Sequence, residues 1–97
     1  MHFVIHALDR AGVLPTRLAH QDAHRAHLAD TARFGVKIVI SGPLVADDGK
    51  TAIGSLFVIE APDRKTVENF HAADPFKTAA VWEKVTLSAF IKRQDNR

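Results

Sequence analysis

One helical segment near the start of the chain carries a histidine at a position where a core residue is expected. Residues 17–28 read RLAHQDAHRAHL, and a rotation of about 100° per residue puts His24 and Leu28 on the buried stripe of the predicted helix. A buried imidazole needs a hydrogen-bond partner, and an imidazole exchanges protons near neutral pH. His24 is therefore a candidate general acid or base. The alternative is a core histidine that is hydrogen-bonded to a backbone carbonyl.

The same segment raises a second hypothesis, a metal site. His20, His24 and His27 follow an i, i+4, i+7 spacing, which places three imidazoles on one helix face. Imidazole nitrogens are common zinc ligands. No HExxH-like base accompanies these histidines, however, and the chain has no cysteine. We therefore expect neither a metal nor an organic cofactor.

Three further side chains are candidates for the same chemistry. Asp74 precedes Pro75, which is typical of a helix N-cap; a carboxylate held in this way can also orient an imidazole. Arg17 can hold an anionic substrate oxygen through its forked donors, or it can be a surface residue at the entrance of the helix. Ser55, next to Gly54, can donate a hydrogen bond to a ligand or can face water at the end of a strand.

Hydrophobic periodicity and turn residues predict the elements that position these side chains. Strands are expected at 2–8, 36–40, 53–60 and 85–91, and a loop at 9–15. One helix is expected to start near Thr16 or His20 and to end at Gly35, and a second helix runs from 62 to about 72. A further helical turn starts at 74 and carries Phe76. A hairpin tip is expected at 47–49. This β-α-β-β-α-β order predicts an α+β, ferredoxin-like fold with both helices on one face of an antiparallel sheet.

The first strand is apolar on both faces. Phe3 and Ile5 alternate with Val4 and Leu8, yet the predicted helices cover only one face of the sheet. An uncovered apolar face indicates an interaction surface. We therefore predict a homodimer in which two sheets pack against each other.

Composition excludes several other classes of protein. The 97 residues, 46% of them hydrophobic, predict a single domain over residues 1–92 with a flexible C-terminal tail at 93–97. The net charge of +2 is scattered, so we expect no nucleic-acid partner. No apolar run is long enough to span a membrane, and the chain opens like a strand rather than a signal peptide. These features predict a cytoplasmic protein, and the candidate side chains described above indicate that its partner is a small molecule.

Several short motifs, in their order and spacing, resemble the YCII-like family. The matching pieces are Phe3-Val4-Ile5, Arg17-Leu18 followed by His24-x-x-His27-Leu28, Ser41-Gly42-Pro43, Gly54-Ser55, Ala73-Asp74-Pro75-Phe76 and Val85-Thr86-Leu87-x-x-Phe90. The resemblance implies a dimeric α/β barrel and an active-site dyad at His24 and Asp74. It also implies kinship with isomerases, monooxygenases and degradative enzymes. One activity in the group is the dehydrochlorination of chlorinated hydroxyhydroquinones, without a metal or an organic cofactor.

These observations predict a small cofactor-free enzyme that works by proton transfer. His24 would move a proton, Asp74 would orient it, and Arg17 and Ser55 would hold substrate oxygens. The expected reaction is an elimination or isomerisation, of the lyase or isomerase type, and the resemblance points to a dehydrochlorination in aromatic degradation. The alternatives are a dimer that binds a small metabolite without turnover and a structural domain without activity.

Overall fold

The computed structural model describes all 97 residues of the chain. Its elements in chain order are β1 (His2–Asp9), α1 (Leu14–Ala19), α2 (Gln21–Ala29), the 3₁₀ helix η1 (Thr31–Phe34), β2 (Lys37–Val45), β3 (Ala52–Glu60), α3 (Arg64–Ala72), α4 (Pro75–Thr78) and β4 (Trp82–Phe90). The predicted order of strands and helical regions is confirmed. The first helical region, however, is divided into three pieces.

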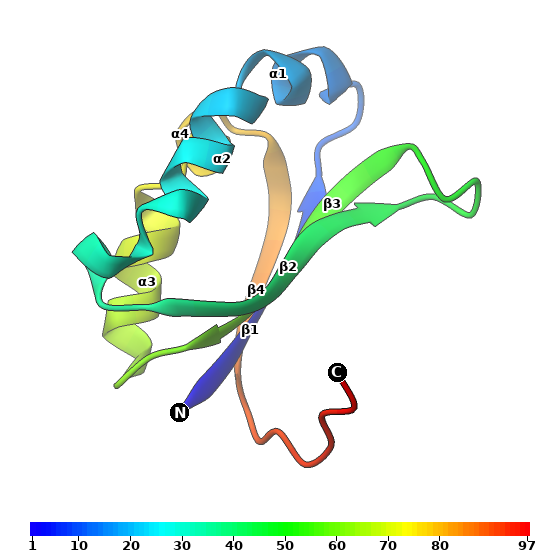
Figure 1. Ribbon diagram of the computed structural model, residues 1–97. Helices are drawn as coiled ribbons and strands as arrows, with labels where there is room; N and C mark the ends of the chain where they lie inside the picture. The colour runs from blue at the N-terminus through cyan, green and yellow to red at the C-terminus, as the bar shows by residue number, and fades with distance from the viewer.

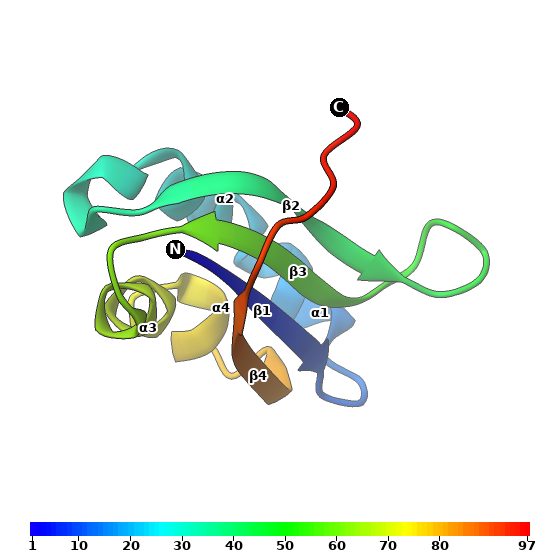
Figure 2. The same ribbon diagram turned by 90° about the horizontal axis from the view of Figure 1, so that it is seen from below.

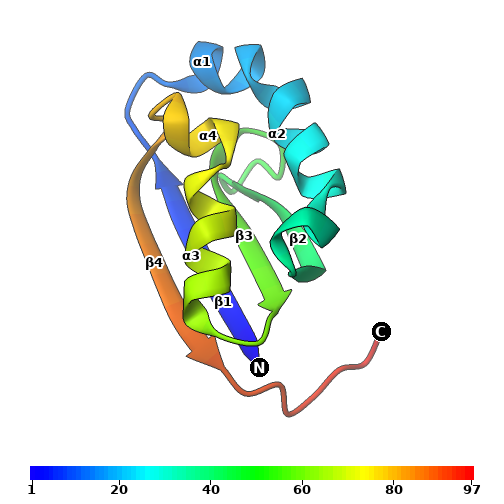
Figure 3. The same cartoon turned by 90° about the vertical axis from the view of Figure 1, so that its left-hand side faces the viewer.

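The four strands form one antiparallel sheet in the order β2-β3-β1-β4. This is the strand order of the ferredoxin-like fold, in which two right-handed crossovers place the helices on the same face. Figure 1 shows all helices on one side of the sheet. In Figure 3 the helices face the viewer, with α3 in front of the middle of the sheet and α2 in front of β2. The predicted fold class is therefore confirmed.

The hydrophobic core lies between the sheet and the helices. The alternation predicted for β1 is confirmed, because Phe3, Ile5 and Ala7 are at most 2% exposed and face the helices. Apolar residues from other strands, helices and loops complete this core: Val36, Phe57, Ile59, Ala61, Val67, Phe70, Phe76, Val81 and Trp82. The core is small, as expected for a chain of this length.

No helix covers the opposite face of the sheet. On that face Val4 of β1 pairs with Val58 of β3, which in turn pairs with Ile40 of β2. Ile40 is 52% exposed and Phe90, near the end of β4, is 42% exposed. The second apolar face predicted from the sequence is therefore present and has no helical cover.

Residues 91–97 follow β4 without helix or strand. Figure 2 shows this segment running from the β4 edge of the sheet toward β2. At its end, Arg97 donates a hydrogen bond to the Val39 carbonyl at 2.8 Å. No helix of the structure combines the length and the apolar character that crossing a membrane requires.

The prediction of one long helix up to Gly35 is wrong. The chain leaves helical geometry at His20 (φ −105°, ψ 6°), between α1 and α2, and at Asp30 (φ −112°, ψ 47°), before η1. Thr16 does not cap a helix, because Val13 occupies the N-cap position of α1 and makes no side-chain cap bond. Gly35 does end the region, in the left-handed conformation that favours glycine (φ 74°).

The remaining boundaries follow the local signals in the sequence. Asp63 caps α3 by accepting a hydrogen bond from the backbone N–H of Thr66 at 2.8 Å. Gly49, with φ 73°, lies at the predicted tip of the β2–β3 hairpin. The last strand begins at Trp82 rather than near Val85, and the Trp82 side chain is buried.

Candidate active site

His24 of α2 and Asp74 at the start of α4 are hydrogen-bonded to each other. The distance from His24 Nδ1 to Asp74 Oδ1 is 2.7 Å, and the two side chains are 11% and 2% exposed. Asp74 Oδ1 also accepts a hydrogen bond from the backbone N–H of Phe76 at 2.9 Å. Asp74 is therefore an N-cap and an imidazole partner at once. The alternative for His24, a bond to a backbone carbonyl, is wrong.

The Asp74 bond determines which nitrogen of the imidazole is available. A carboxylate accepts a hydrogen bond from Nδ1–H, so a neutral His24 keeps its lone pair on Nε2. His24 lines a cavity of about 550 Å³, whereas Asp74 does not line it and lies behind the imidazole. Of the two residues, only His24 can contact a ligand in the cavity. The arrangement offers one imidazole nitrogen to a ligand and one to a buried carboxylate.

Phe76 lies between the imidazole and a buried arginine. Its ring is stacked on His24 with centroids 3.9 Å apart and an interplanar angle of 8°. The Arg17 guanidinium carbon lies 4.7 Å from the same ring centroid. Phe57 and Trp82 contact the imidazole edge-on, at 6.1 and 6.2 Å. Aromatic contacts on several sides therefore fix the orientation of the imidazole ring.

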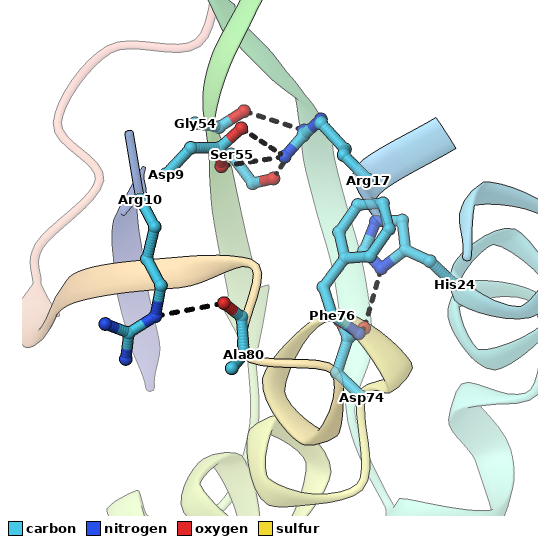
Figure 4. A network of polar contacts seen from close by, with 9 residues as sticks. All are labelled: Asp9, Arg10, Arg17, His24, Gly54, Ser55, Asp74, Phe76 and Ala80. Carbon is cyan, nitrogen blue, oxygen red and sulfur yellow. Dashed lines mark hydrogen bonds and ion pairs between the residues drawn. The ribbon is translucent and has the colours of Figure 1, made fainter. Parts of the chain in front are cut away.

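Arg17 of α1 is buried, so the alternative of a surface arginine is wrong. One terminal nitrogen donates to both carboxylate oxygens of Asp9, at 2.9 and 3.3 Å, and the other donates to the Gly54 carbonyl at 2.8 Å and to Ser55 Oγ at 2.9 Å. Figure 4 shows these bonds above the His24–Asp74 pair. Arg17 thus ties α1 to the ends of β1 and β3.

Burial affects both members of the Arg17–Asp9 ion pair. It lowers the pKa of Arg17, and the carboxylates of Asp9 and Asp74 oppose that change. It raises the pKa of Asp9, and the Arg17 charge opposes that change. Arginine remains charged in proteins because its ordinary pKa exceeds about 12. A permanent positive charge therefore lies within the buried wall of the cavity.

Ser55 is 2% exposed and lies on the helix-facing side of β3, so the alternative of a strand-end hydroxyl in water is wrong. Its Oγ accepts a hydrogen bond from Arg17, and the residue lines the cavity together with His24. A hydroxyl that accepts one bond can still donate its own proton. Ser55 can therefore donate to an oxygen of a bound ligand.

The cavity lies between α1, α2 and the strands β2 and β3. Leu14, Leu18, Phe57 and Phe76 are among its apolar lining residues. A volume of about 550 Å³ falls in the range of sites for small ligands. Apolar walls with a few convergent polar groups are typical of such sites. The cavity can hold a single aromatic ring with its substituents.

The three histidines of the metal hypothesis have separate surroundings. His27 Nε2 donates to the Phe70 carbonyl at 2.9 Å, and its ring is stacked on Phe70 at 4.4 Å. His24 is bound to Asp74, and His20 is exposed. No group of three or more His, Cys, Asp or Glu side chains gathers at a position that could hold a metal ion. His27, not His24, is the core histidine with a backbone partner.

Sequence reasoning missed two residues of this site, Asp9 and Phe76. Asp9 was expected in a loop, but it ends β1 and shares the helix-facing side with Phe3, Ile5 and Ala7. The alternation of β1 could have indicated this position, because it places a carboxylate on the buried face. Phe76 was expected only as an apolar residue of the last helical turn.

Residues 1–91 match the YCII-related domain, so the chain belongs to the YCII-related family. The resemblance seen in the sequence motifs is confirmed. The protein is therefore a small α+β domain with a ferredoxin-like sheet and a cavity between the sheet and the helices.

Particular relatives are similar over nearly the whole chain. Protein YciI of Escherichia coli O6:H1 (strain CFT073) is 31% identical over 97 residues, which cover 95% of this chain and 98% of that protein. Among solved structures, 5-chloro-2-hydroxyhydroquinone dehydrochlorinase (TftG) from Burkholderia phenoliruptrix AC1100, in complex with 2,5-dihydroxybenzoquinone, has a TM-score of 0.83. It is 29% identical, and the match covers 94% of each chain. An antibiotic biosynthesis monooxygenase with a TM-score of 0.52 and 18% identity, matched over 95% of this chain and 100% of that one, shares the fold alone.

Proposed function

We propose that this protein is a cofactor-free enzyme that removes the elements of HCl from a chlorinated hydroxyhydroquinone by proton transfer. The observation that carries the proposal is the buried His24–Asp74 pair at 2.7 Å, with the imidazole lining a cavity of about 550 Å³. The similarity to TftG, a dehydrochlorinase, supports the choice of reaction. The choice of this substrate class rests on that similarity.

The roles of the two residues follow from their contacts. Asp74 is nearly inaccessible to solvent and holds the imidazole through Nδ1, so Nε2 is the atom that exchanges protons with a ligand. When His24 takes a proton, the adjacent carboxylate stabilises the imidazolium. Asp74 is therefore a positioning residue, and His24 is the catalytic acid and base.

The proposed reaction consists of two proton movements. His24 takes the proton of the hydroxyl next to the carbon–chlorine bond and delivers it to the carbon that carries the chlorine. The hydroxyl para to the first one then loses its proton to water, its electron pair moves through the ring, and the carbon–chlorine bond breaks. One proton and one chloride ion leave, and the product is a hydroxyquinone. The step therefore consumes neither oxidant nor reductant.

Other residues of the cavity bind the ring and its oxygens. Phe57 and the edge of Phe76 give the cavity aromatic walls that suit an aromatic ring. The Ser55 hydroxyl can donate to a ring oxygen, and the buried charge of Arg17 stabilises negative charge that develops on that oxygen. These residues position the substrate, and they move no proton.

The test is chloride release from 5-chloro-2-hydroxyhydroquinone, measured without oxygen. We expect the wild-type protein to release chloride, with and without EDTA, and His24→Ala to lower the rate by about 10²–10⁴-fold. His20→Ala is the matched control, because His20 is an exposed histidine of the same segment, and it should retain the rate. Unchanged chloride release by His24→Ala would contradict the proposed role of this residue.

One observation favours a second candidate, a dimer that binds a small metabolite without turnover. The two terminal nitrogens of Arg17 already donate hydrogen bonds to Asp9, Gly54 and Ser55. This arginine therefore has a structural role that does not require a substrate. A binding protein retains its affinity for 2,5-dihydroxybenzoquinone when the imidazole is removed. The combination of unchanged affinity in His24→Ala and no chloride release by the wild type would support this candidate.

We also propose that the protein is a homodimer. The support is the uncovered apolar face of the sheet, with Ile40 and Phe90 exposed and Val4 and Val58 between them. Burying that face against a second copy removes it from water without any further element of the chain.

A further inference from the structure

The charge around the cavity is unevenly distributed. Its lining includes the cationic side chains Arg17, Arg25 and Lys50, as well as His24, and it includes neither Asp nor Glu. The charge of Arg17 is balanced by Asp9 at 2.9 Å, behind the wall. Arg25 and Lys50 take part in none of the ion pairs of the protein. Two positive charges of the cavity therefore have no partner in the chain.

These two cations come from different parts of the fold. Arg25 follows His24 directly on α2, and Lys50 lies in the hairpin that joins β2 to β3. Figure 1 shows this hairpin extending beyond the body of the sheet, at the end where α1 lies. Both residues are exposed, so they lie at the opening of the cavity, while Arg17 and His24 are buried deeper. A ligand entering the cavity passes both cations.

The carboxylates that are close to these cations in the sequence, Asp22, Asp47 and Asp48, do not line the cavity. Asp48, in the same hairpin as Lys50, accepts bonds from the backbone N–H groups of Lys50 and Thr51 and from the Thr51 hydroxyl, and it does not line the cavity. Asp22, three positions before Arg25 on α2, is exposed and does not line the cavity either. The opening of the cavity therefore presents positive charge to a ligand.

We propose that the site selects a hydroxylated aromatic ring that also carries a carboxylate. The ring lies against Phe57 with a hydroxyl at His24, and the carboxylate lies at the opening near Arg25 and Lys50. Arginine suits this position because its forked donors match a carboxylate. This inference rests on the proposed function and narrows its substrate class to hydroxyhydroquinone rings that also carry a carboxylate. It assigns Arg25 and Lys50 as the residues that determine specificity.

The test compares two ligands of nearly the same shape, 2,5-dihydroxybenzoate and 2,5-dihydroxybenzamide, in which a neutral carboxamide replaces the carboxylate. We expect calorimetric titration of the wild-type protein to give about 10-fold tighter binding of the benzoate, as two charge contacts near the surface produce. Raising the salt concentration should reduce this preference, because salt screens exposed charges. In the double variant Arg25→Gln, Lys50→Gln the two ligands should bind equally.

The matched control is Lys65→Gln, Arg93→Gln, which removes the same total charge from exposed residues outside the cavity. It should retain the preference for the benzoate. Equal binding of the two ligands by the wild type, or a preference that survives in Arg25→Gln, Lys50→Gln, overturns the inference. The titration measures binding and needs no turnover, so its result can contradict this inference without contradicting the proposed function. Preference for the benzoate without chloride release contradicts only the proposed function, and chloride release without the preference contradicts only this inference.

Discussion

Replacing Asp74 by asparagine separates the two roles of this residue. Oδ1 accepts hydrogen bonds from His24 Nδ1 at 2.7 Å and from the Phe76 N–H at 2.9 Å. The side-chain oxygen of asparagine can accept both bonds with the same geometry. The variant Asp74→Asn therefore keeps the helix cap and the orientation of the imidazole, and it removes the negative charge beside it.

The expected magnitudes follow from the burial of the pair, whose side chains are 11% and 2% exposed. Two unit charges about 4 Å apart interact by about 4 kcal/mol at an effective dielectric constant near 20. This support for the imidazolium is lost in Asp74→Asn, which corresponds to a rate about 10³-fold lower. In Asp74→Asn an amide NH2 group replaces Oδ2, the carboxylate oxygen that has no hydrogen-bond partner in the protein. Burying this group without a partner lowers the free energy of unfolding by about 1–2 kcal/mol. We therefore expect a large loss of rate and a small loss of stability.

The measurements are chloride release and urea unfolding, with Asp63→Asn as the matched control. Asp63 caps α3 through a bond of 2.8 Å from the Thr66 N–H, but it is exposed and does not line the cavity. The control should retain its rate and lose less stability than Asp74→Asn, because asparagine also caps helices and the amide at position 63 stays in contact with water. If Asp74→Asn retains a rate within about threefold of the wild type, or if Asp63→Asn loses rate equally, the charge of Asp74 has no catalytic role.

Three other predictions concern the rest of the molecule. Val58→Lys places a charge in the uncovered face of the sheet. It should convert a dimer that buries on the order of 1,600 Å² into a monomer, which sedimentation would detect. A wild-type protein that is a monomer at micromolar concentration would contradict the proposed dimer. Gly54→Ala should destabilise the fold by about 2–3 kcal/mol, because its Cβ would collide with the Ala7 carbonyl, whereas Gly42→Ala meets no atom within 4 Å and should be neutral in the same unfolding assay. Burial lowers the pKa of His71 below the ordinary 6.5, so the unfolded chain binds that proton more tightly and stability should fall as the pH decreases below about 6.5. The variant His71→Gln should show a weaker pH dependence of stability in urea unfolding. The same pH dependence in the variant and the wild type would refute the assignment to His71.

The strands and their faces could be predicted because each depends on local signals. The alternation of Phe3, Ile5 and Ala7 with Val4 and Leu8 assigned both faces of β1. Side-chain caps and glycines likewise marked the ends of helices and turns. The division of the first helical region could not be predicted in this way. No proline or glycine stands at the break at His20, and the residues on either side fit a helix.

The contacts of the candidate site join residues that are distant in the sequence. His24 and Asp74 are 50 positions apart, and Arg17 and Ser55 are 38 positions apart. Periodicity assigns a side chain to a face, but it does not identify the partner across the core. The pairing of His24 with Asp74 was predicted only through the family resemblance. The partner of Arg17 was not predicted, because Asp9 was assigned to a loop instead of the buried face of β1.

The charges of the site form an inner set and an outer set. Arg17, Asp9 and Asp74 are buried and together carry one net negative charge, so a proton taken by His24 makes the inner set neutral. A substrate anion placed among these groups would meet carboxylates behind Arg17 and His24. At the opening, by contrast, Arg25 and Lys50 have no ion-pair partner. A fixed negative charge on the substrate therefore has its lowest energy at the opening of the cavity. The substrate group that gives up a proton is expected beside His24. We therefore expect this separation of charge to orient a substrate ring in the cavity.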